Sequence, residues 1–249
     1  RKKKAHVYLN DFTNFKKLGY LISGLSPTHI VNCIGVTKFN NSYDIRKQTR
    51  LINTKLPKFL KNFCLKKKIF FIHFSTDCVF SGKKGDYSDF STKDAQDLYG
   101  ITKNKGEVKN LYSTTIRTSF IGPEKKSHKS LLNWFLKQEN DVNGFNNALF
   151  SGLTSLELSS IIYKFFLKKN KLYNNIINVG GNTISKYSLL KIISKVFKRK
   201  ILIKKFYDFK IDRSLNSQKF RKLSKYKVKS WFVMLKELRI FMINNNYKF

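Results

Sequence analysis

Short apolar runs alternate along this chain with longer stretches in which apolar residues recur every three or four positions. Ile69–Ser75 is the clearest run, because six of its seven residues are apolar, aromatic or histidine. Asn14–Leu25 shows the other pattern, with apolar side chains spaced to share one face of a helix. Strands that alternate with helices are typical of a parallel sheet with crossover helices, so the pattern predicts an α/β fold.

The same patterns predict the remaining elements. Further strands are expected at His6–Leu9, His29–Ile34, Thr114–Ile121 and Asn175–Val179. Further helices are expected at Ile45–Cys64, Leu98–Asn110, Leu131–Lys137, Thr154–Lys168 and Lys186–Phe197. A kink is expected at Pro57, because proline lacks the backbone N–H that a helix interior uses.

The chain of 249 residues has a formal net charge of +35, which raises the hypothesis of a nucleic-acid partner. Only eight of its 50 basic residues are arginine, and the lysines are spread from Lys2 to Lys248. Lysine, asparagine, isoleucine and phenylalanine share A/T-rich codons, so a biased genome also explains this charge. We therefore expect no nucleic-acid partner.

The lengths of the apolar runs and the number of cysteines indicate where in the cell the protein is expected. The runs are far shorter than a bilayer requires, and the basic start at Arg1 is followed by no export signal, so we expect no membrane association. The three cysteines, Cys33, Cys64 and Cys78, are too few for a disulfide framework, which favours a reducing compartment and a cytoplasmic location. No spacing of zinc ligands is found, and no metal is expected.

Ligands of an open α/β sheet bind beyond the carboxyl ends of its strands. Ser75-Thr76-Asp77 ends the clearest strand, and Tyr99 and Lys103 lie four residues apart on a later helix, hence on one face. The alternative for Tyr99 and Lys103 is a solvent-exposed helix face. Two other pairs have this spacing but follow no such strand: Tyr43 with Lys47 and Tyr187 with Lys191.

Several motifs in this order resemble the extended short-chain dehydrogenase/reductases, and within them the dTDP-4-dehydrorhamnose reductases. The motifs are Phe74 to Gly82, Tyr87, Tyr99-Gly100-x-x-Lys103-x-x-Gly106-Glu107, Ile116 to Phe120, and Asp212 to Ser217 followed by Trp231. The resemblance implies a Rossmann-like doubly wound parallel sheet in residues 1–124 and a smaller C-terminal substrate-binding lobe in residues 125–249, with residues 154–180 returning to the main sheet.

The resemblance also implies an activity, which is reduction of a nucleotide-linked 4-keto-6-deoxy sugar with NADP or NAD as cofactor. A homodimer is a further hypothesis. Tyr99 would donate a proton to the carbonyl oxygen, and Thr76 would orient that carbonyl. Lys103 would hold the ribose and lower the pKa of Tyr99, because an ammonium about 4 Å away contributes roughly 4 kcal/mol at an effective dielectric near 20.

The resemblance assigns further residues to the two ligands. Those expected to line the cofactor, besides Tyr99 and Lys103, are Asp11, Phe12, Gly35, Val36 and Thr37. Those expected to bind the substrate, besides Thr76, are Asp77, Phe120 and Arg213, with Arg213 on the diphosphate because a guanidinium grips phosphate oxygens in pairs. The alternative for Arg213 is an ordinary surface arginine.

Two departures from the family pattern limit these expectations. Cys78 stands where the reductases carry tyrosine and the related dehydratases carry glutamate, which disfavours a dehydratase. The Gly-x-x-Gly-x-x-Gly turn that binds the cofactor pyrophosphate is missing, so we expect an N-terminally incomplete sheet, through either a fragment boundary or a deletion. NADP and NAD both stay open. A non-catalytic relative that regulates a partner is the second hypothesis, and a nucleic-acid-binding protein is the third.

Overall fold

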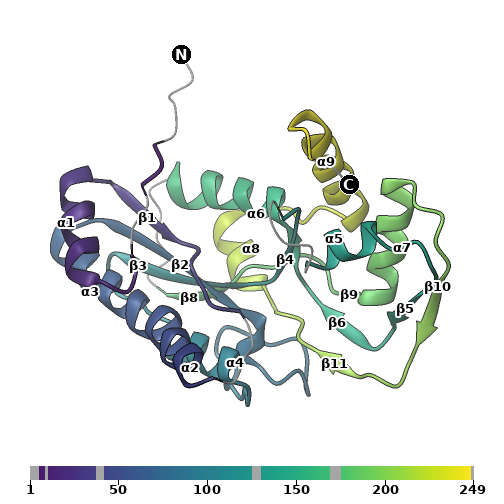
Figure 1. Ribbon diagram of the computed structural model, residues 1–249, viewed down its shortest axis with the longest axis horizontal. Helices are drawn as coiled ribbons and strands as arrows, with labels where there is room; N and C mark the ends of the chain where they lie inside the picture. Colours follow the sequence, from purple (N-terminus) through teal and green to yellow (C-terminus); the bar gives the residue numbers. More distant parts are fainter. Residues whose placement is uncertain (1–5, 9–10, 38–41, 125–129, 169–174, 248–249) are drawn as a thin grey trace.

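Four parallel strands form the main sheet of the computed structural model, which describes residues 6–8, 11–37, 42–124, 130–168 and 175–247. In sheet order these strands are β1 (His29–Asn32), β2 (Phe70–Thr76), β3 (Ser113–Thr118) and β8 (Ile176–Asn178). Figure 1 shows β8, which comes from the second half of the chain, beside β3. The α/β parallel sheet is thus confirmed, and the predicted return of the chain near residue 176 occurs.

Strand register places the carboxyl ends of the central strands at one edge. Asn32 pairs with His73, and Thr76 pairs with Thr118. Successive side chains of a strand point to opposite faces, so Phe71 packs with α1 (Phe15–Leu25) and α3 (Leu56–Lys67), whereas Ile72 packs in the larger core of the second half. Both side chains are fully buried, as the apolar run of β2 predicted.

Residues 43–67 form one helical stretch with a change of hydrogen-bond pattern in it. The stretch consists of α2 (Tyr43–Arg50), the π-helical turn η1 (Leu51–Lys55) and α3. Pro57 lies in the first turn of α3, directly after the π turn. Because proline has no N–H, the carbonyl of Asn53 loses its usual α-helical donor, and this carbonyl lies within the π turn.

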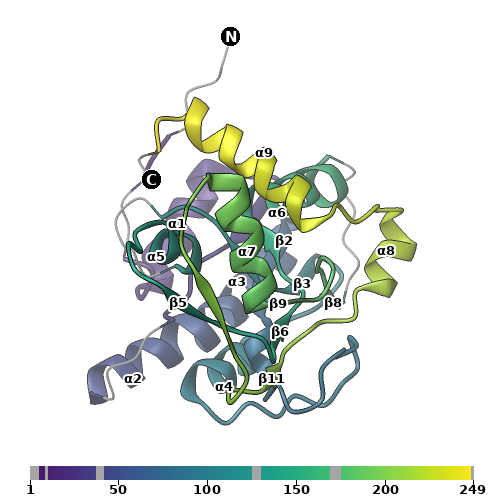
Figure 2. The ribbon, with the colours of Figure 1, turned by 90° about the vertical axis from the view of Figure 1, so that its right-hand side faces the viewer.

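The second half of the chain contains short strands and the helices that pack on them. The strands are β4 (Phe120–Ile121), β5 (Val142–Phe145), β6 (Ala148–Phe150), β7 (Leu153–Thr154), β9 (Ile184–Ser185), β10 (Ile203–Phe206) and β11 (Ile211–Asp212). The helices are α5 (Leu131–Leu136), α6 (Ser155–Ile161) with the π turn η3 (Ile162–Leu167), α7 (Lys186–Phe197), α8 (Gln218–Ser224) and α9 (Trp231–Asn244). Figure 2 shows α9 across α7, and both helices contribute to the larger core.

Three sequence predictions differ from the structure. His6, Val7 and Tyr8 form no strand, and Leu9 lies outside the described residues. The strand expected at Thr114–Ile121 is divided into β3 and β4 around Ser119. The helix expected at Leu98–Asn110 is α4 (Leu98–Lys105), which Gly106 ends. In the described ranges, no helix is both long and apolar enough to cross a membrane.

Candidate active site

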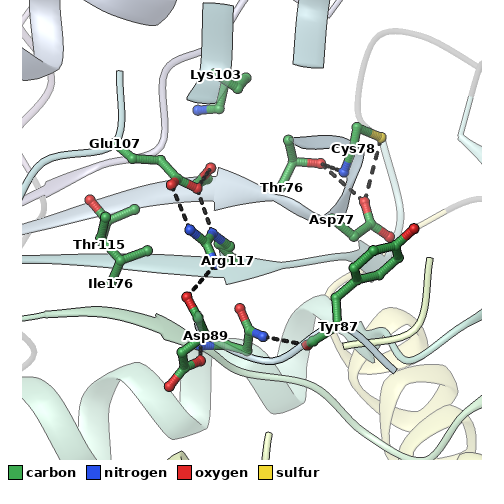
Figure 3. A network of polar contacts seen from close by, with 12 residues as sticks. Thr76, Asp77, Cys78, Tyr87, Asp89, Lys103, Glu107, Thr115, Arg117 and Ile176 are labelled. Carbon is green, nitrogen blue, oxygen red and sulfur yellow. Dashed lines mark hydrogen bonds and ion pairs between the residues drawn. The ribbon is translucent and has the colours of Figure 1, made fainter. Parts of the chain in front are cut away.

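Thr76 ends β2 and begins the short 3-10 turn η2 (Asp77–Val79). Its hydroxyl accepts a hydrogen bond from the Cys78 N–H at 3.1 Å and donates one to the Asp77 carboxylate at 3.1 Å (Figure 3). Threonine suits this place because its side chain can cap a turn at the point where a strand stops. The hydroxyl is buried at the carboxyl edge of the sheet.

Helix α4 presents Tyr99 and Lys103 to this edge. Asp97 caps the helix by accepting a hydrogen bond from the Gly100 N–H at 2.8 Å. A Cβ at position 100 would clash with the carbonyl oxygen of Cys78, so only glycine lets α4 approach η2 so closely. That approach brings the Tyr99 hydroxyl close enough to Thr76 for the threonine to affect its pKa.

Lys103 is buried, and its ammonium donates a hydrogen bond to the Phe74 carbonyl oxygen at 2.5 Å. Burial lowers the pKa of Lys103 to about 8, although the charges of Glu107 and Cys33 act in the opposite direction. Most of the lysine is therefore still protonated at neutral pH. The ammonium is held one residue before Ser75, at the carboxyl end of β2.

The pKa of Tyr99 differs from the sequence expectation. It is raised to about 12, mainly because burial disfavours the phenolate, and Cys78 adds to the rise while the hydrogen bond with Thr76 opposes it. We expected Lys103 to lower this pKa, but the lysine directs its ammonium at the Phe74 carbonyl. Tyr99 is consequently protonated at neutral pH, which is the form that can donate a proton.

The segment after β1 lies beside Lys103. An ideal Cβ on Gly35 would lie 3.9 Å from the lysine Nζ. Asn53, from the π turn η1, accepts a hydrogen bond from the Val36 N–H at 2.9 Å and donates one to the Val36 carbonyl at 3.0 Å. Thr37 follows and is exposed. The structure thus brings the expected cofactor segment together with Lys103.

Asp11 and Phe12 lie at the start of α1. The Asp11 carboxylate accepts hydrogen bonds from Thr13, which lower its pKa, and Phe12 packs on the core beneath α1. In the described residues, no hydrogen bond or ion pair joins this pair to Thr76, Tyr99 or Lys103.

A cavity of about 420 Å³ opens beside Asp77 and Cys78, and Arg213 lines it. Arg213 donates hydrogen bonds to the Phe80 carbonyl at 3.1 Å and to the Cys78 sulfur at 3.2 Å. Burial raises the pKa of Asp77, against the hydrogen bonds from Thr76 and Cys78 and the charges of Lys186 and Arg213. Asp77 and Arg213, both expected to bind the substrate, thus line the same cavity.

Phe120 does not share that cavity. Its side chain is 58% exposed and lines a second cavity with Cys33 and Phe74. Ser119 lines the first cavity instead. Neighbouring residues of an extended chain point to opposite sides, so Phe120 does not face the cavity of Asp77. That Phe120 binds the sugar stays a prediction.

A buried ion pair behind the site was not foreseen from the sequence. Arg117 donates to both carboxylate oxygens of Glu107, at 2.7 and 2.8 Å, and to the Asp89 carbonyl at 3.0 Å (Figure 3). Ser75 also donates to Glu107, at 2.8 Å. An arginine inside a predicted strand was the available signal, because buried charge requires a partner.

Lys186 was also missed. It lines the cavity of Asp77 and Arg213, although in the sequence it marked only the start of a helix. The available signal was its position, because a lysine in the first turn of a helix opposes the helix dipole.

Comparison with known proteins adds a family and a fold. Residues 4–143 match the family model described as RmlD substrate binding domain. A dTDP-4-keto-6-deoxy-D-glucose reductase of Streptomyces niveus is 30% identical over 117 residues, which are 45% of this chain and 41% of the relative's length. The chain thus spans less than half of that relative.

Two solved structures share the fold. A dTDP-4-dehydrorhamnose reductase of Bacillus anthracis in complex with NADP is 18% identical, with a TM-score of 0.81 over 94% of this chain and 87% of that one. A hypothetical dTDP-4-dehydrorhamnose reductase of Sulfolobus tokodaii is 23% identical, with a TM-score of 0.76 over 92% of this chain and 87% of that one.

Proposed function

This chain belongs to the family of the RmlD substrate-binding domain, and from that membership we propose that it reduces the keto group of a nucleotide-linked 4-keto-6-deoxy sugar. The observation that supports the proposal is the meeting of Thr76, Tyr99 and Lys103 at the carboxyl end of β2. The names of the similar proteins agree with a dTDP-linked substrate and with NADP or NAD as cofactor.

Tyr99 is the proposed proton donor. Reduction of a ketone requires a proton at the carbonyl oxygen as a hydride reaches the carbon. The raised pKa of Tyr99, about 12, keeps the phenol protonated before the reaction. Its hydroxyl lies close to Thr76, the residue proposed to orient the carbonyl.

Thr76 is the proposed orienting residue. Its hydroxyl has one hydrogen, which the structure directs at Asp77. To hold the substrate carbonyl, the hydroxyl turns that hydrogen from the Asp77 carboxylate to the carbonyl oxygen, while it continues to accept from the Cys78 N–H. A donor aimed at the oxygen where charge develops stabilises the transition state.

The residues around Lys103 fit a nicotinamide riboside. The ammonium has three donors, one of which the Phe74 carbonyl takes, and Gly35 beside it has no side chain to block approach. When bound, NADPH or NADH supplies the hydride. We assign the ribose to Lys103 and the adjoining surface to Gly35, Val36 and Thr37. Asp11 and Phe12 are proposed to lie beside the adenine.

We assign the substrate to the cavity of Asp77 and Arg213. Asp77 would accept from a sugar hydroxyl, and Arg213 would bind the diphosphate through the guanidinium edge that faces the cavity. On this proposal residues 1–124 bind the cofactor and residues 125–249 mainly bind the substrate, with residues 154–180 completing the main sheet.

A single substitution tests the proposal. Tyr99→Phe removes only the hydroxyl that would donate the proton, so it should slow the reduction of a dTDP-linked 4-keto-6-deoxy sugar about 100-fold or more. The rate is measured from the oxidation of NADPH. Tyr43→Phe is the matched control, because Tyr43 belongs to the same Tyr-x-x-x-Lys spacing but is 79% exposed on α2.

Equal rates for Tyr99→Phe and the unaltered protein would contradict the proposed proton donor. Binding of the cofactor without any turnover would instead favour a non-catalytic relative.

A further inference from the structure

The cavity beside Asp77 is lined by a second cation, Lys186, to which the proposed reduction assigns no role. Lys186 is the first residue of α7 and lines the cavity together with Arg213. Its Nζ lies 3.8 Å from the centre of the Phe150 ring. Within the part of the chain that the structure describes, no hydrogen-bond acceptor or ion-pair partner is found for this ammonium.

Several effects disfavour an ammonium at this position, and the contact with the Phe150 ring opposes them. Burial lowers the pKa of Lys186, although the charges of Asp77 and Cys78 act in the opposite direction. The first turn of a helix carries the positive end of the helix dipole, which repels an ammonium. A desolvated cation without a hydrogen bond adds a further cost. Such local conflicts are typical of positions that bind a ligand.

The lining of the cavity indicates the kind of ligand. Asp77 is its only acidic residue among those described, against the two cations Lys186 and Arg213. The amino end of α7 adds a partial positive charge. The lining also includes three aromatic side chains, Trp134, Phe145 and Phe209, here called the aromatic wall. Two cations and an aromatic wall in one cavity fit an anion that carries a flat ring.

We propose that Lys186 binds the diphosphate of a nucleoside diphosphate, which it shares with Arg213, and that the aromatic wall holds the base. The inference rests on the proposed function, because it takes the nucleotide part of a nucleotide sugar as the ligand. It adds a binding residue from the second half of the chain, on a helix that carries none of the reductase motifs. The cavity volume of about 420 Å³ lies within the range of small-ligand sites.

Titration calorimetry with thymidine diphosphate and with thymidine tests this assignment. Lys186→Met removes the charge and keeps most of the side-chain volume. Loss of a charge-assisted hydrogen bond should weaken the binding of thymidine diphosphate by about 10- to 100-fold and leave the binding of thymidine unchanged. Lys186→Arg keeps the charge and should retain most of the affinity. Lys191→Met is the matched control, because Lys191 lies exposed on the same helix.

Unchanged affinity of Lys186→Met for thymidine diphosphate would overturn the proposal. An equal loss for thymidine would overturn it as well, because that result indicates a distorted cavity and not a lost phosphate contact.

A measurement on the unaltered protein covers the case in which the variants do not fold. Lysine acetylation is followed by mass spectrometry with and without thymidine diphosphate. We expect protection of Lys186 and none of Lys191. Equal labelling of Lys186 in both samples would contradict the proposal.

Failure of this inference differs from failure of the proposed function. A protein that reduces the keto sugar but binds thymidine diphosphate independently of Lys186 retains the function and loses the inference. A protein that binds thymidine diphosphate through Lys186 but reduces no keto sugar would support the role of Lys186 and contradict the proposed function.

Discussion

At the scale of single residues, the buried ammonium of Lys103 makes the site sensitive to pH. Its pKa is lowered to about 8, mainly by burial. If the charged lysine holds the ribose, kcat/KM for NADPH should be constant below pH 8 and fall about tenfold per unit above it. The free energy of unfolding should instead increase with pH in this range. Between pH 8 and the ordinary lysine pKa of 10.5, the unfolded chain binds more protons than the folded protein, so a rise in pH disfavours unfolding.

The variant Lys103→Arg distinguishes the titration of Lys103 from the titration of other groups in the protein. In Lys103→Arg the guanidinium stays charged, so the fall above pH 8 should disappear even if the absolute rate is lower. A fall that persists in the variant would assign the titration to another group. Thermal unfolding over the same pH range shows whether the protein remains folded.

The sequence indicated some residues of the candidate site and missed others. Thr76, Tyr99 and Lys103 were found because their spacing relates them to one strand end and one helix face. Lys186 was not, since a lysine is uninformative in a chain where 50 residues are basic. Its burial depends on β6 and on the turn after β2, which only the folded chain brings together with α7.

At the scale of elements, the contact between α4 and η2 fixes the position of the proposed proton donor. Gly100→Ala would place a methyl group against the Cys78 carbonyl and the Ala95 side chain. We expect a loss of about 1–3 kcal/mol in the free energy of unfolding, measured in urea. A shift of α4 by about 1 Å should also lower kcat about 100-fold.

Gly24→Ala is the matched control for that prediction. Gly24 lies in α1, and a methyl group added there would meet no heavy atom within 4 Å, so alanine should be neutral or stabilising. A fully active Gly100→Ala protein would show that α4 tolerates displacement.

In the main sheet, β2 and β8 were predictable because they are short, mostly buried apolar runs. β3 is fully buried as well, although five of its six residues are polar. Strands β5, β6, β7, β9, β10 and β11 were not predicted, because they are two to four residues long and β10 exposes Lys204 and Lys205. Helix α9 was missed for a related reason. Apolar residues occur on its exposed side too, among them Phe232, Val233 and Ile240, so it shows no single apolar stripe.

At the scale of the whole molecule, the Arg117 network links the sheet to the second half of the chain. Arg117 on β3 bonds to Glu107, after α4, and to the Asp89 carbonyl. The Asp89 carboxylate in turn accepts from the Asn178 N–H on β8, at 2.7 Å, and lies 3.8 Å from the ammonium of Lys219 on α8. Loss of Arg117 should therefore disturb both halves of the chain.

Arg117→Met should lower the free energy of unfolding by about 3–5 kcal/mol, because Glu107 would remain buried without its partner. The double variant Glu107→Leu with Arg117→Met removes both charges and should be less destabilised than Arg117→Met alone. Both are measured by urea unfolding. Lys204→Met breaks an exposed pair with Asp141 and should change stability by less than about 1 kcal/mol.

Greater damage in the double variant than in Arg117→Met would contradict this explanation, because it would mean that the carboxylate of Glu107 is not the source of the instability.

The π turn at Leu51–Lys55 makes the loss of a single residue from this helical stretch costly. A π turn holds one residue more than the α-helical turn it replaces. Asn53 lies in it and fixes Val36 through two hydrogen bonds. Deletion of one residue there would remove the π turn and rotate one flank by about 100° relative to the other. Either Asn53 would turn away from Val36, or α3 would turn its apolar face away from the sheet. We therefore expect a one-residue deletion in this helical stretch to be poorly tolerated.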